Sequence, residues 1–496
     1  MAKIPLLNGA YAARSVIANA QRAVNLYCEL NPKDAESPTT HYPTPGLTLR
    51  ANAGSSGGWR CLYRASNGEL FGINGATVYY IDSSWNLTSL GLITLNTTPA
   101  SMQDNGTTLV VVDGTGRGYT VDLTSHAFAQ IVDPNFFGSV HVDYLDTYLL
   151  FGQPNTRNFY SSLSNSVAFD ALYLAAKTAY PDKLVAVYVT HRDIWLIGDL
   201  RTEIWYNAGT AGFPFALTPG AYVDIGCVAK YSIATHGKFL FWLSQDKDGR
   251  CIVVRAKAYE SERISTFAIE NAISSYTAID DAVGYVYQQE GHIFYVLNFP
   301  SANSGRGATW VYDLQSPSEL PLWHERVWLD TQGRECRHRG QCATNAYGKI
   351  VVGDWENGNL YTFELDVYTD NGSPIVRRRG FMHITAEGER VSFETFQADI
   401  EAGTDDGTID GTSQTSPPQI FLRWSDDRGK TFGTPVPQSL GAVGQYLVQP
   451  QWNRLGYARD RVFELFWSCP TKTALNGAYL HGIAAEPTVQ ATPPNG

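Results

Sequence analysis

The chain has 496 residues, of which 44% are hydrophobic, and this is enough for a large core spread over two or three domains or over one repetitive domain. Its formal net charge of -11 and its pI of about 5.4 argue against a surface that grips DNA phosphates, which needs clustered Lys and Arg. No stretch of about 18 apolar residues occurs, so the sequence predicts no membrane-spanning helix and no standard export signal.

Composition favours strands and turns over helices. Aromatic residues make up 12% of the chain, and these residue types favour strands. The 45 Gly and 24 Pro are spread along its length, which indicates frequent turns. The seven cysteines are odd in number and scattered, so we expect reduced thiols in a protein assembled in a cytosol rather than a disulfide framework. The sequence therefore predicts an all-β protein.

The first 54 residues lack any regular strand pattern. The stretch "SVIANAQRAVNLYCELNPKD" from Ser15 is irregular, and "YPTPGL" then closes the segment with two prolines. We interpret residues 1–54 as an extended N-terminal arm with room for one short helix. Apolar residues such as Ile4, Val24 and Leu26 have no partners within such an arm, so we expect a neighbouring subunit or an adaptor protein to order it.

A repeated unit occupies residues 55–370. It consists of a short apolar strand, a turn of Gly, Asn or Asp, and a second strand rich in Tyr or Trp, as in "GELFGINGATVYYID". Successive units start about 37 to 57 residues apart, close to the period of propeller blades, and the linking segments leave room for two more strands each. The pattern predicts a six- or seven-bladed β-propeller and leaves both counts open. The units start at Gly68, Asn105, Leu145, His191, His236, Glu290 and Tyr347.

Strands resume in residues 371–485. The segments "RVSFETFQADIEAG", "PQIFLRWSDD", "RVFELFWSCP" and "GAYLHGIAAEP" have strand length and apolar character, and we interpret them as a C-terminal β-sandwich. Between the first two lies a polar loop in which Asp405, Asp406 and Asp410 could hold calcium, although an ordinary loop is the favoured interpretation. Residues 486–496 are expected to form a flexible tail.

One motif at first suggests an enzyme. The sequence "SDDRGKTF" from Ser425 matches the Asp box, S-x-D-x-G-x-T-[W/F], which is familiar from sialidases and other propeller glycosidases. In propellers the box is a hairpin at a blade rim: Ser425 and Asp427 bond the turn backbone, Gly429 takes a positive φ, and Phe432 packs beneath, with Thr431 completing the pattern. We therefore predict a structural hairpin without activity.

No other motif supports catalysis. The segment 54–58 formally satisfies the G-x-S-x-G pattern, but no helix is expected after it, and it is interpreted as a linker. Residues 113–118 resemble a phosphate loop, yet they lie between two strands and indicate a hairpin turn. Cys336–Cys342 lacks a fourth zinc ligand, and Arg377–Arg379 is interpreted as a solvated edge or an ion-pair cluster. We predict no enzyme, no catalytic residue, no cofactor and no metal.

One stretch resembles a known family. The sequence "RISTFAIENAISSYTAIDDAVGYVYQQEGHIFYVLNFP", residues 263–300, is similar to the matching part of the packaged-DNA stabilisation, or tail-hub (nozzle), proteins of short-tailed, podovirus-type bacteriophages. They carry I-x-x-x-I-x-S-Y-T-x-x-x-A before a strand, and here the run starts at Ile269 with a one-residue slip before Ala282. The resemblance is patchy over residues 20–330 and loose in the sandwich. It extends to "TEIWYNAG" at 202–209, where the family has an ion-paired Glu-Ile, to "GCVAKYSIA" at 226–234 and to "AVNLYCELNP" with "YPTPGL" in the arm.

The resemblance implies a structural virion protein. It implies a ring, a homo-hexamer, below the portal and the head-to-tail adaptor, which extends the DNA channel, retains the packaged genome with a tail needle or plug, and permits ejection. Tail fibres or spikes are further partners, and assembly takes place in the cytoplasm of the host bacterium, without membrane insertion. An acidic wall would let double-stranded DNA pass without specific binding, because it repels phosphate.

Two alternatives stay open. A propeller glycan hydrolase would need clustered carboxylates at the central mouth, and a lectin-like glycan-binding tail module would need exposed aromatic platforms at blade rims. The sequence leaves open the phage and its host, the ring stoichiometry, whether the channel is open or closed, and the partner of the C-terminal domain.

Overall fold

The computed structural model describes residues 2–4, 10–15, 19–246, 249–386, 388–403 and 417–484. In this part of the chain, strands dominate, and the only helices are α1 (Phe267–Ser274) and α2 (Ala302–Gly305). The prediction of an all-β protein is confirmed. The expectations for Asp405, Asp406 and Asp410 and for the tail 486–496 concern residues outside the described ranges.

Over the described residues, the propeller consists of seven antiparallel four-stranded units in chain order. The first is β8 (Trp59–Arg64), β9 (Leu70–Asn74), β10 (Thr77–Ile81) and β11 (Leu87–Leu92); the second is β12 (Ser101–Asp104), β13 (Thr108–Val112), β14 (Gly118–Asp122) and β15 (Phe128–Gln130); the third is β16 (Val142–Leu145), β17 (Tyr148–Gly152), β18 (Asn158–Ser162) and β19 (Phe169–Ala176).

The remaining units continue the same order. The fourth is β20 (Leu184–Thr190), β21 (Asp193–Gly198), β22 (Thr202–Asn207) and β23 (Phe215–Val223); the fifth is β24 (Ala234–His236), β25 (Phe239–Gln245), β26 (Cys251–Lys257) and β27 (Glu260–Arg263); the sixth is β28 (Val283–Gln289), β29 (His292–Phe299), β30 (Ala308–Asp313) and β31 (Trp323–Glu325); the seventh is β34 (Gly340–Ala346), β35 (Lys349–Asp354), β36 (Asn359–Glu364) and β7 (Gly46–Asn52). Each repeat found in the sequence supplies the second and third strands of one unit.

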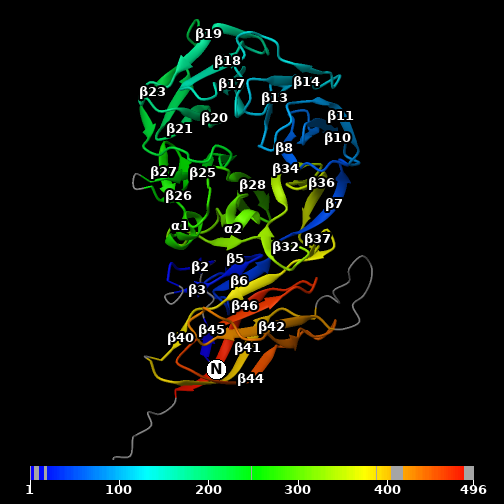
Figure 1. Cartoon of the computed structure of the whole chain (residues 1–496), viewed down its shortest axis with the longest axis vertical. Coiled ribbons are helices and arrows are strands. Elements are labelled where there is room, and N and C mark those ends of the chain that lie inside the picture. The colour runs from blue at the N-terminus through cyan, green and yellow to red at the C-terminus, as the bar shows by residue number, and fades with distance from the viewer. Residues whose placement is uncertain are drawn as a thin grey trace, which may run out of the picture.

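The ring closes with a strand from the N-terminal part of the chain. Strand β7 pairs antiparallel with β36, from Gly46 opposite Glu364 to Asn52 opposite Asn359. The first strands of the units surround the centre, and β8 of the first unit lies beside β34 of the last (Figure 1). The segment 46–52, which was expected in the arm, is therefore the fourth strand of the seventh unit, and two short strands, β37 (Thr369–Asp370) and β38 (Ser373–Pro374), extend the sheet beyond it.

Alternating side chains explain why the units stack radially. In β13, Leu109 and Val111 pack against the first unit, whereas Val110 and Val112 face the third, as period-two alternation requires. A hydrophobic cluster of this kind lies between each pair of neighbouring units, including the pair formed by the seventh and first. Both faces of every sheet are thus covered by its neighbours.

The C-terminal part is a β-sandwich, which confirms the prediction for this domain. One sheet has β41 (Val391–Ile400) between β44 (Gln451–Ala458) and β46 (Leu475–Ala484), and β1 (Ala2–Ile4) pairs with β46. The other runs β39 (Arg377–Gly380), β45 (Asp460–Trp467), β42 (Gln419–Ser425), β43 (Val436–Ser439), and β40 (Ile384–Thr385) pairs with β45. Aromatic side chains from both sheets, including Phe396, Trp452 and Phe463, fill the core between them.

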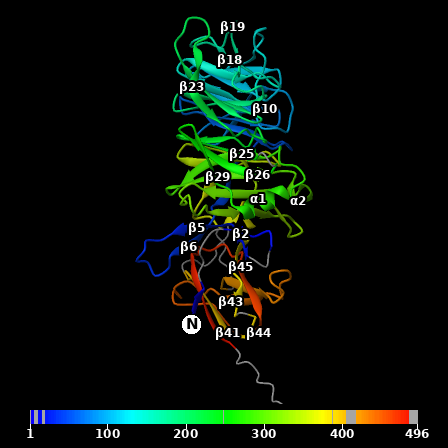
Figure 2. The same ribbon diagram turned by 90° about the vertical axis from the view of Figure 1, so that its left-hand side faces the viewer.

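The N-terminal arm is built into the junction of the two domains. Strand β4 (Ala23–Val24) pairs in parallel with β31 and antiparallel with β39, so it joins the sixth propeller sheet and one sandwich sheet into ten continuous strands. Strands β5 (Leu26–Leu30) and β6 (Thr39–Pro43) extend the other sandwich sheet through β46, and Figure 1 and Figure 2 show them between the domains, which stand end to end.

The arm's burial corrects an expectation from the sequence. Val24 and Leu26 are fully buried by contacts within this chain, so a neighbouring subunit is not needed to cover them. The side chain of Ile4 lies outside the described part. No helix occurs in the described residues before β7; the remaining short strands there are β2 (Tyr11–Ala12) and β3 (Ala20–Gln21), and those near the junction are β32 (Val327–Leu329), β33 (Glu335–Arg337), β37 (Thr369–Asp370) and β38 (Ser373–Pro374).

Candidate functional site: the propeller mouth and the interdomain junction

The propeller mouth is surrounded by two kinds of loop: the connections that enter each unit's first strand, and the hairpins between its second and third strands. They touch closely. A Cβ atom at Gly58 would lie 2.0 Å from the carbonyl oxygen of Trp355, and one at Gly226 would lie 2.2 Å from that of Asp199. In both places a connection crosses the hairpin of the preceding unit, where only glycine fits. The repeated contact fixes the loops around the mouth.

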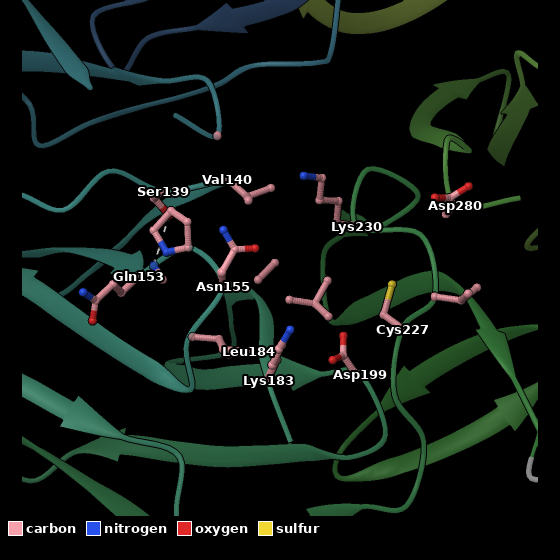
Figure 3. Close-up of a pocket in the computed structure, with 16 residues that line it drawn as sticks. Ser139, Val140, Gln153, Asn155, Lys183, Leu184, Asp199, Cys227, Lys230 and Asp280 are labelled. Carbon is pink, nitrogen blue, oxygen red and sulfur yellow. Dashed lines mark hydrogen bonds between the residues drawn. The ribbon is translucent and has the colours of Figure 1, made fainter. Parts of the chain in front are cut away.

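Two cavities open at this mouth, and both are lined by Lys230 and Asp280. The smaller has a volume of about 280 Å³, and Figure 3 shows Lys183 and Asp199 around it together with the two shared residues. Partial burial and the neighbouring Asp182 raise the pKa of Asp199. The mouth therefore carries charges of both signs.

The larger cavity has a volume of about 620 Å³ and holds buried cationic groups. Arg60, only 4% exposed, donates from Nε to the carbonyl of Thr98 and from Nη1 to that of Gly75. Arg337 lies over the ring of Trp355, with 4.1 Å between its Cζ and the ring centroid. Burial lowers the pKa of Arg337 to about 10. Both guanidinium groups stay charged at neutral pH.

One segment that resembles the phage family lines this mouth, and another binds the loop before the fourth unit. "GCVAKYSIA" supplies Lys230, and the strand "TEIWYNAG" holds Glu203. The carboxylate of Glu203 accepts hydrogen bonds from backbone N–H groups of the loop before the fourth unit, at 2.8 Å from Ala179 and 3.2 Å from Tyr180. The indole Nε1 of Trp205 also donates to this carboxylate, at 3.3 Å, so the described contacts of Glu203 are hydrogen bonds from neutral N–H groups.

The junction is the second candidate surface, and an ionic network crosses it. Glu335 of the propeller accepts from Arg22 of the arm, at 3.1 Å, and from Arg378 of the sandwich. Arg22 also binds Glu325 through two hydrogen bonds of 2.9 and 2.7 Å, and Arg378 reaches Glu464 at 3.3 Å. Burial opposes ionisation, but Arg22 and Arg378 together hold the pKa of Glu335 below its usual value. One carboxylate thus links three parts of the chain.

Buried arginines surround this network. Arg326 donates to the carbonyl of Pro45 at 3.0 Å, Arg377 to that of Cys469 at 2.9 Å, and Arg379 to the amide oxygen of Gln21 at 2.8 Å. Burial lowers the pKa of Arg377 and of Arg379 to about 10. Arg377 and Arg379 are therefore buried, and the half-buried Arg378 forms ion pairs with Glu335 and Glu464, as the ion-pair interpretation expects.

Asn25 connects the arm to both domains. Its Nδ2 donates to the carbonyl of Val327 at 2.9 Å and to that of Val376 at 2.8 Å, and its Oδ1 accepts from the backbone N–H of Val327 at 2.9 Å. Its φ of 51° lies in the left-handed region, which Asn tolerates better than most residues. Asn25 therefore supplies hydrogen-bond partners to backbone groups of Val327 and Val376 where the two domains meet.

The Asp-box residues lie in the sandwich rather than at a blade rim: Ser425 ends β42, and the others follow it directly. Asp427 Oδ1 accepts from the backbone N–H of Thr431 at 2.8 Å, and Ser425 Oγ accepts from that of Gly429 at 2.8 Å, where φ is 84°. Phe432 is half-buried, with Arg423 above its ring at 4.8 Å. These contacts stabilise one turn, and both carboxylate oxygens of Asp427 accept hydrogen bonds within it.

The other motifs show no site chemistry. Asp113 accepts from the backbone N–H and hydroxyl of Thr115, as expected of a hairpin turn between β13 and β14. In the described ranges, no cluster of three or more His, Cys, Asp or Glu is arranged to hold a metal ion. His338 is buried, and burial holds its pKa far below the usual value. Among the helices in those ranges, none has the length and apolar character needed to cross a membrane.

Fold and surfaces together define a two-domain structural protein, in which a propeller with a polar mouth is joined by its own N-terminal strand to a sandwich. Residues 2–368 match the family model described as bacteriophage P22 Gp10, β-propeller, and residues 377–482 match that of bacteriophage P22 Gp10, β-sandwich. The chain therefore belongs to the P22 Gp10 family, the packaged-DNA stabilisation and tail-hub proteins of podovirus-type phages. It is a structural protein of the phage tail.

Comparison with curated proteins found no match. Among solved structures, the extracellular domain of a hybrid two-component system from B. thetaiotaomicron is similar at 8% identity and a TM-score of 0.42, over 64% of this chain and 39% of that one. A chain of a mitotic checkpoint complex is similar at 10% identity and a TM-score of 0.38, over 68% of this chain and 97% of that one.

Proposed function

We propose that copies of this protein form the ring of the tail hub below the portal and the head-to-tail adaptor, six in number as the family resemblance implies. The ring extends the DNA channel and retains the packaged genome until ejection. The observation that carries this proposal is the family match over both domains, 2–368 and 377–482. A closed ring requires two different patches that meet head to tail.

The junction supports a mechanical role. Strand β4 joins the two domains into one sheet, and Glu335 forms ion pairs with the arm and the sandwich. The two domains should therefore move as one rigid body under load rather than rotate about a flexible linker. The net charge of -11 favours passage of DNA without adhesion. We propose a tail needle or plug, and fibres or spikes, as further partners, with assembly in the host cytoplasm.

We further propose that the protein has no catalytic activity. A glycan hydrolase requires two carboxylates that flank the scissile bond. At the mouth, the carboxylates of Asp199 and Asp280 share their cavity with Lys183 and Lys230, which favours a binding surface over an acid–base pair. Glycan turnover by the purified protein would support the hydrolase alternative instead.

The Asp box has a purely structural role in this proposal. Replacing Asp427 by Ala removes the acceptor of two backbone N–H groups, Lys430 and Thr431, and should lower the melting temperature. Entry of the variant into phage particles should not change. A variant of unchanged melting temperature that fails to enter particles would show that the turn is instead a contact site.

Native mass measurement tests the central proposal. The purified protein is measured alone and after mixing with its purified adaptor, and a discrete ring bound to the adaptor is expected. Particles made without the protein should lose their DNA after packaging. A protein that stays monomeric with the adaptor, together with DNA-retaining particles that lack it, would overturn the tail-hub ring.

A further inference from the structure

The larger cavity at the mouth contains hydrogen-bonding groups that no described residue satisfies. Arg60 is held rigidly by three carbonyl contacts, yet its Nη2 donates no hydrogen bond within the described chain, and its nearest carboxylate oxygen, on Asp113, lies 3.9 Å away. The indole Nε1 of Trp355 likewise has no acceptor there. Buried donors of this kind cost free energy unless a partner supplies oxygen atoms.

One acceptor accompanies these donors. Asp281 Oδ2 receives hydrogen bonds from the backbone N–H and hydroxyl of Ser301, at 2.9 and 2.5 Å, whereas its Oδ1 has no donor in the described chain. Lys230 is exposed at the rim that both cavities share, and Leu95, 79% exposed, adds an apolar edge. The lining thus offers several donors, one acceptor and one apolar contact.

We propose that the propeller mouth binds an acidic peptide segment of another tail protein, with a carboxylate of that segment directed at Arg60 and Lys230. This deepens the proposed tail-hub function, on which it rests. Peptide carbonyls match the free N–H of Trp355, and peptide N–H groups match Asp281 Oδ1. A cavity of about 620 Å³ holds a short segment only.

The chemistry of the cavity excludes two other ligands. Nucleic acid is disfavoured because the phosphates that a DNA backbone presents are acceptors only, and they would leave Asp281 Oδ1 without a donor. A sugar would stack on an open aromatic face, but Arg337 covers one face of Trp355, Lys230 lies over the ring of Tyr231, and Trp59 is fully buried. The peptide is the ligand whose donors and acceptors fit both sets of free groups.

An array of overlapping short peptides from the other tail proteins tests the proposal, probed with the full-length chain. The peptides that bind should be acidic. The same peptides with Gln in place of Glu and Asn in place of Asp should no longer bind. The variant Lys230→Glu should weaken the best peptide about tenfold or more in fluorescence anisotropy. Leu95→Asp, at an exposed position, should weaken it as well, and Lys33→Glu, at an exposed turn away from the mouth, is the matched control.

Three results would overturn the inference: no acidic peptide bound, binding unchanged in both mouth variants, or binding only of a glycan or a DNA oligonucleotide placed on the same array. Incorporation of the protein into phage tails is scored separately. A protein that enters tails yet binds no peptide refutes this inference alone, whereas a protein absent from tails refutes the proposed function.

Discussion

At the scale of single residues, the buried carboxyl of Asp370 makes the stability of the protein depend on pH. It lies in β37 beside β7, and burial raises its pKa to about 6, although Arg326 and Arg377 act in the opposite direction. In the unfolded chain an aspartate has a pKa of about 3.9. Between these values the folded protein holds a proton that the unfolded chain has lost, so its stability falls as the pH rises through about 6.

Replacing Asp370 by Asn removes this titration. We expect the free energy of unfolding of the variant, relative to that of the natural protein, to rise by about 2 to 3 kcal/mol between about pH 4 and pH 8. Urea denaturation at a series of pH values measures the difference. Asp34→Asn, at an exposed turn, controls for the change of net charge. A difference that stays flat with pH would mean that Asp370 does not titrate in this range.

Asn25 gives a second prediction at this scale. Asn25→Ala loses three buried hydrogen bonds and places a Cβ residue without polar atoms at a φ of 51°, so it should lower the free energy of unfolding by about 3 kcal/mol. Asn25→Gly loses the same bonds without backbone strain and should cost about 1 kcal/mol less. Equal losses in both variants would show that strain at this position is unimportant.

Single residues were also the hardest features to predict from the sequence. The run at 377–379 is polar in composition, and composition alone does not distinguish a solvated edge from a buried strand. Its burial depends on β4, a strand of two residues whose pairing partners lie about 300 and 350 positions further along the chain. The Asp-box turn was easier, because its donors and acceptors lie within a few residues of one another.

At the scale of elements, the sequence pattern predicted the hairpins, whose strands are neighbours in the chain. The seven repeats from Gly68 to Tyr347 are the central hairpins of the seven units, in which the second strand of each unit is apolar and largely buried. The outer strands were not found because most of them are half exposed and carry no apolar run, and the buried β31 has only three residues. The closing strand β7 was assigned to the arm, since its partner β36 is remote in the sequence.

The position of β7 makes two deletions differ sharply. Removing residues 1–44 takes away β1 to β6 but keeps β7, so the propeller should stay folded while the sandwich loses its connection to it. Removing residues 1–52 also takes away β7 and exposes the apolar surface that Leu47 covers in the seventh unit. We expect calorimetry to show two separate transitions for the first deletion, and aggregation on size-exclusion chromatography for the second.

Equal behaviour of the two deletions would contradict this interpretation. If both chains aggregate, the arm is required for folding of the propeller as well as for its connection to the sandwich. If both remain soluble with one transition, β7 is dispensable, and the ring does not depend on closure by that strand.

At the scale of the whole molecule, closure of the ring and the junction together determine shape. Hydrophobic clusters fill all seven interfaces between neighbouring units, so no propeller sheet has a free face. The sandwich is continuous with the sixth sheet through β4 and stands at one end of the long axis (Figure 2). The sequence predicted both domains and their order, whereas their arrangement depends on pairings between distant segments.

The charge of the whole molecule leads to the last prediction. A wall that guides DNA without holding it must repel phosphate, and a chain with a net charge of -11 does so at any distance that salt does not screen. We expect no retardation of a double-stranded DNA fragment in a gel-shift assay at about 0.15 M salt, and none at lower salt, where a basic protein would bind more tightly. A shift that strengthens steeply as salt falls would reveal a phosphate-binding surface and would contradict passive passage through the channel.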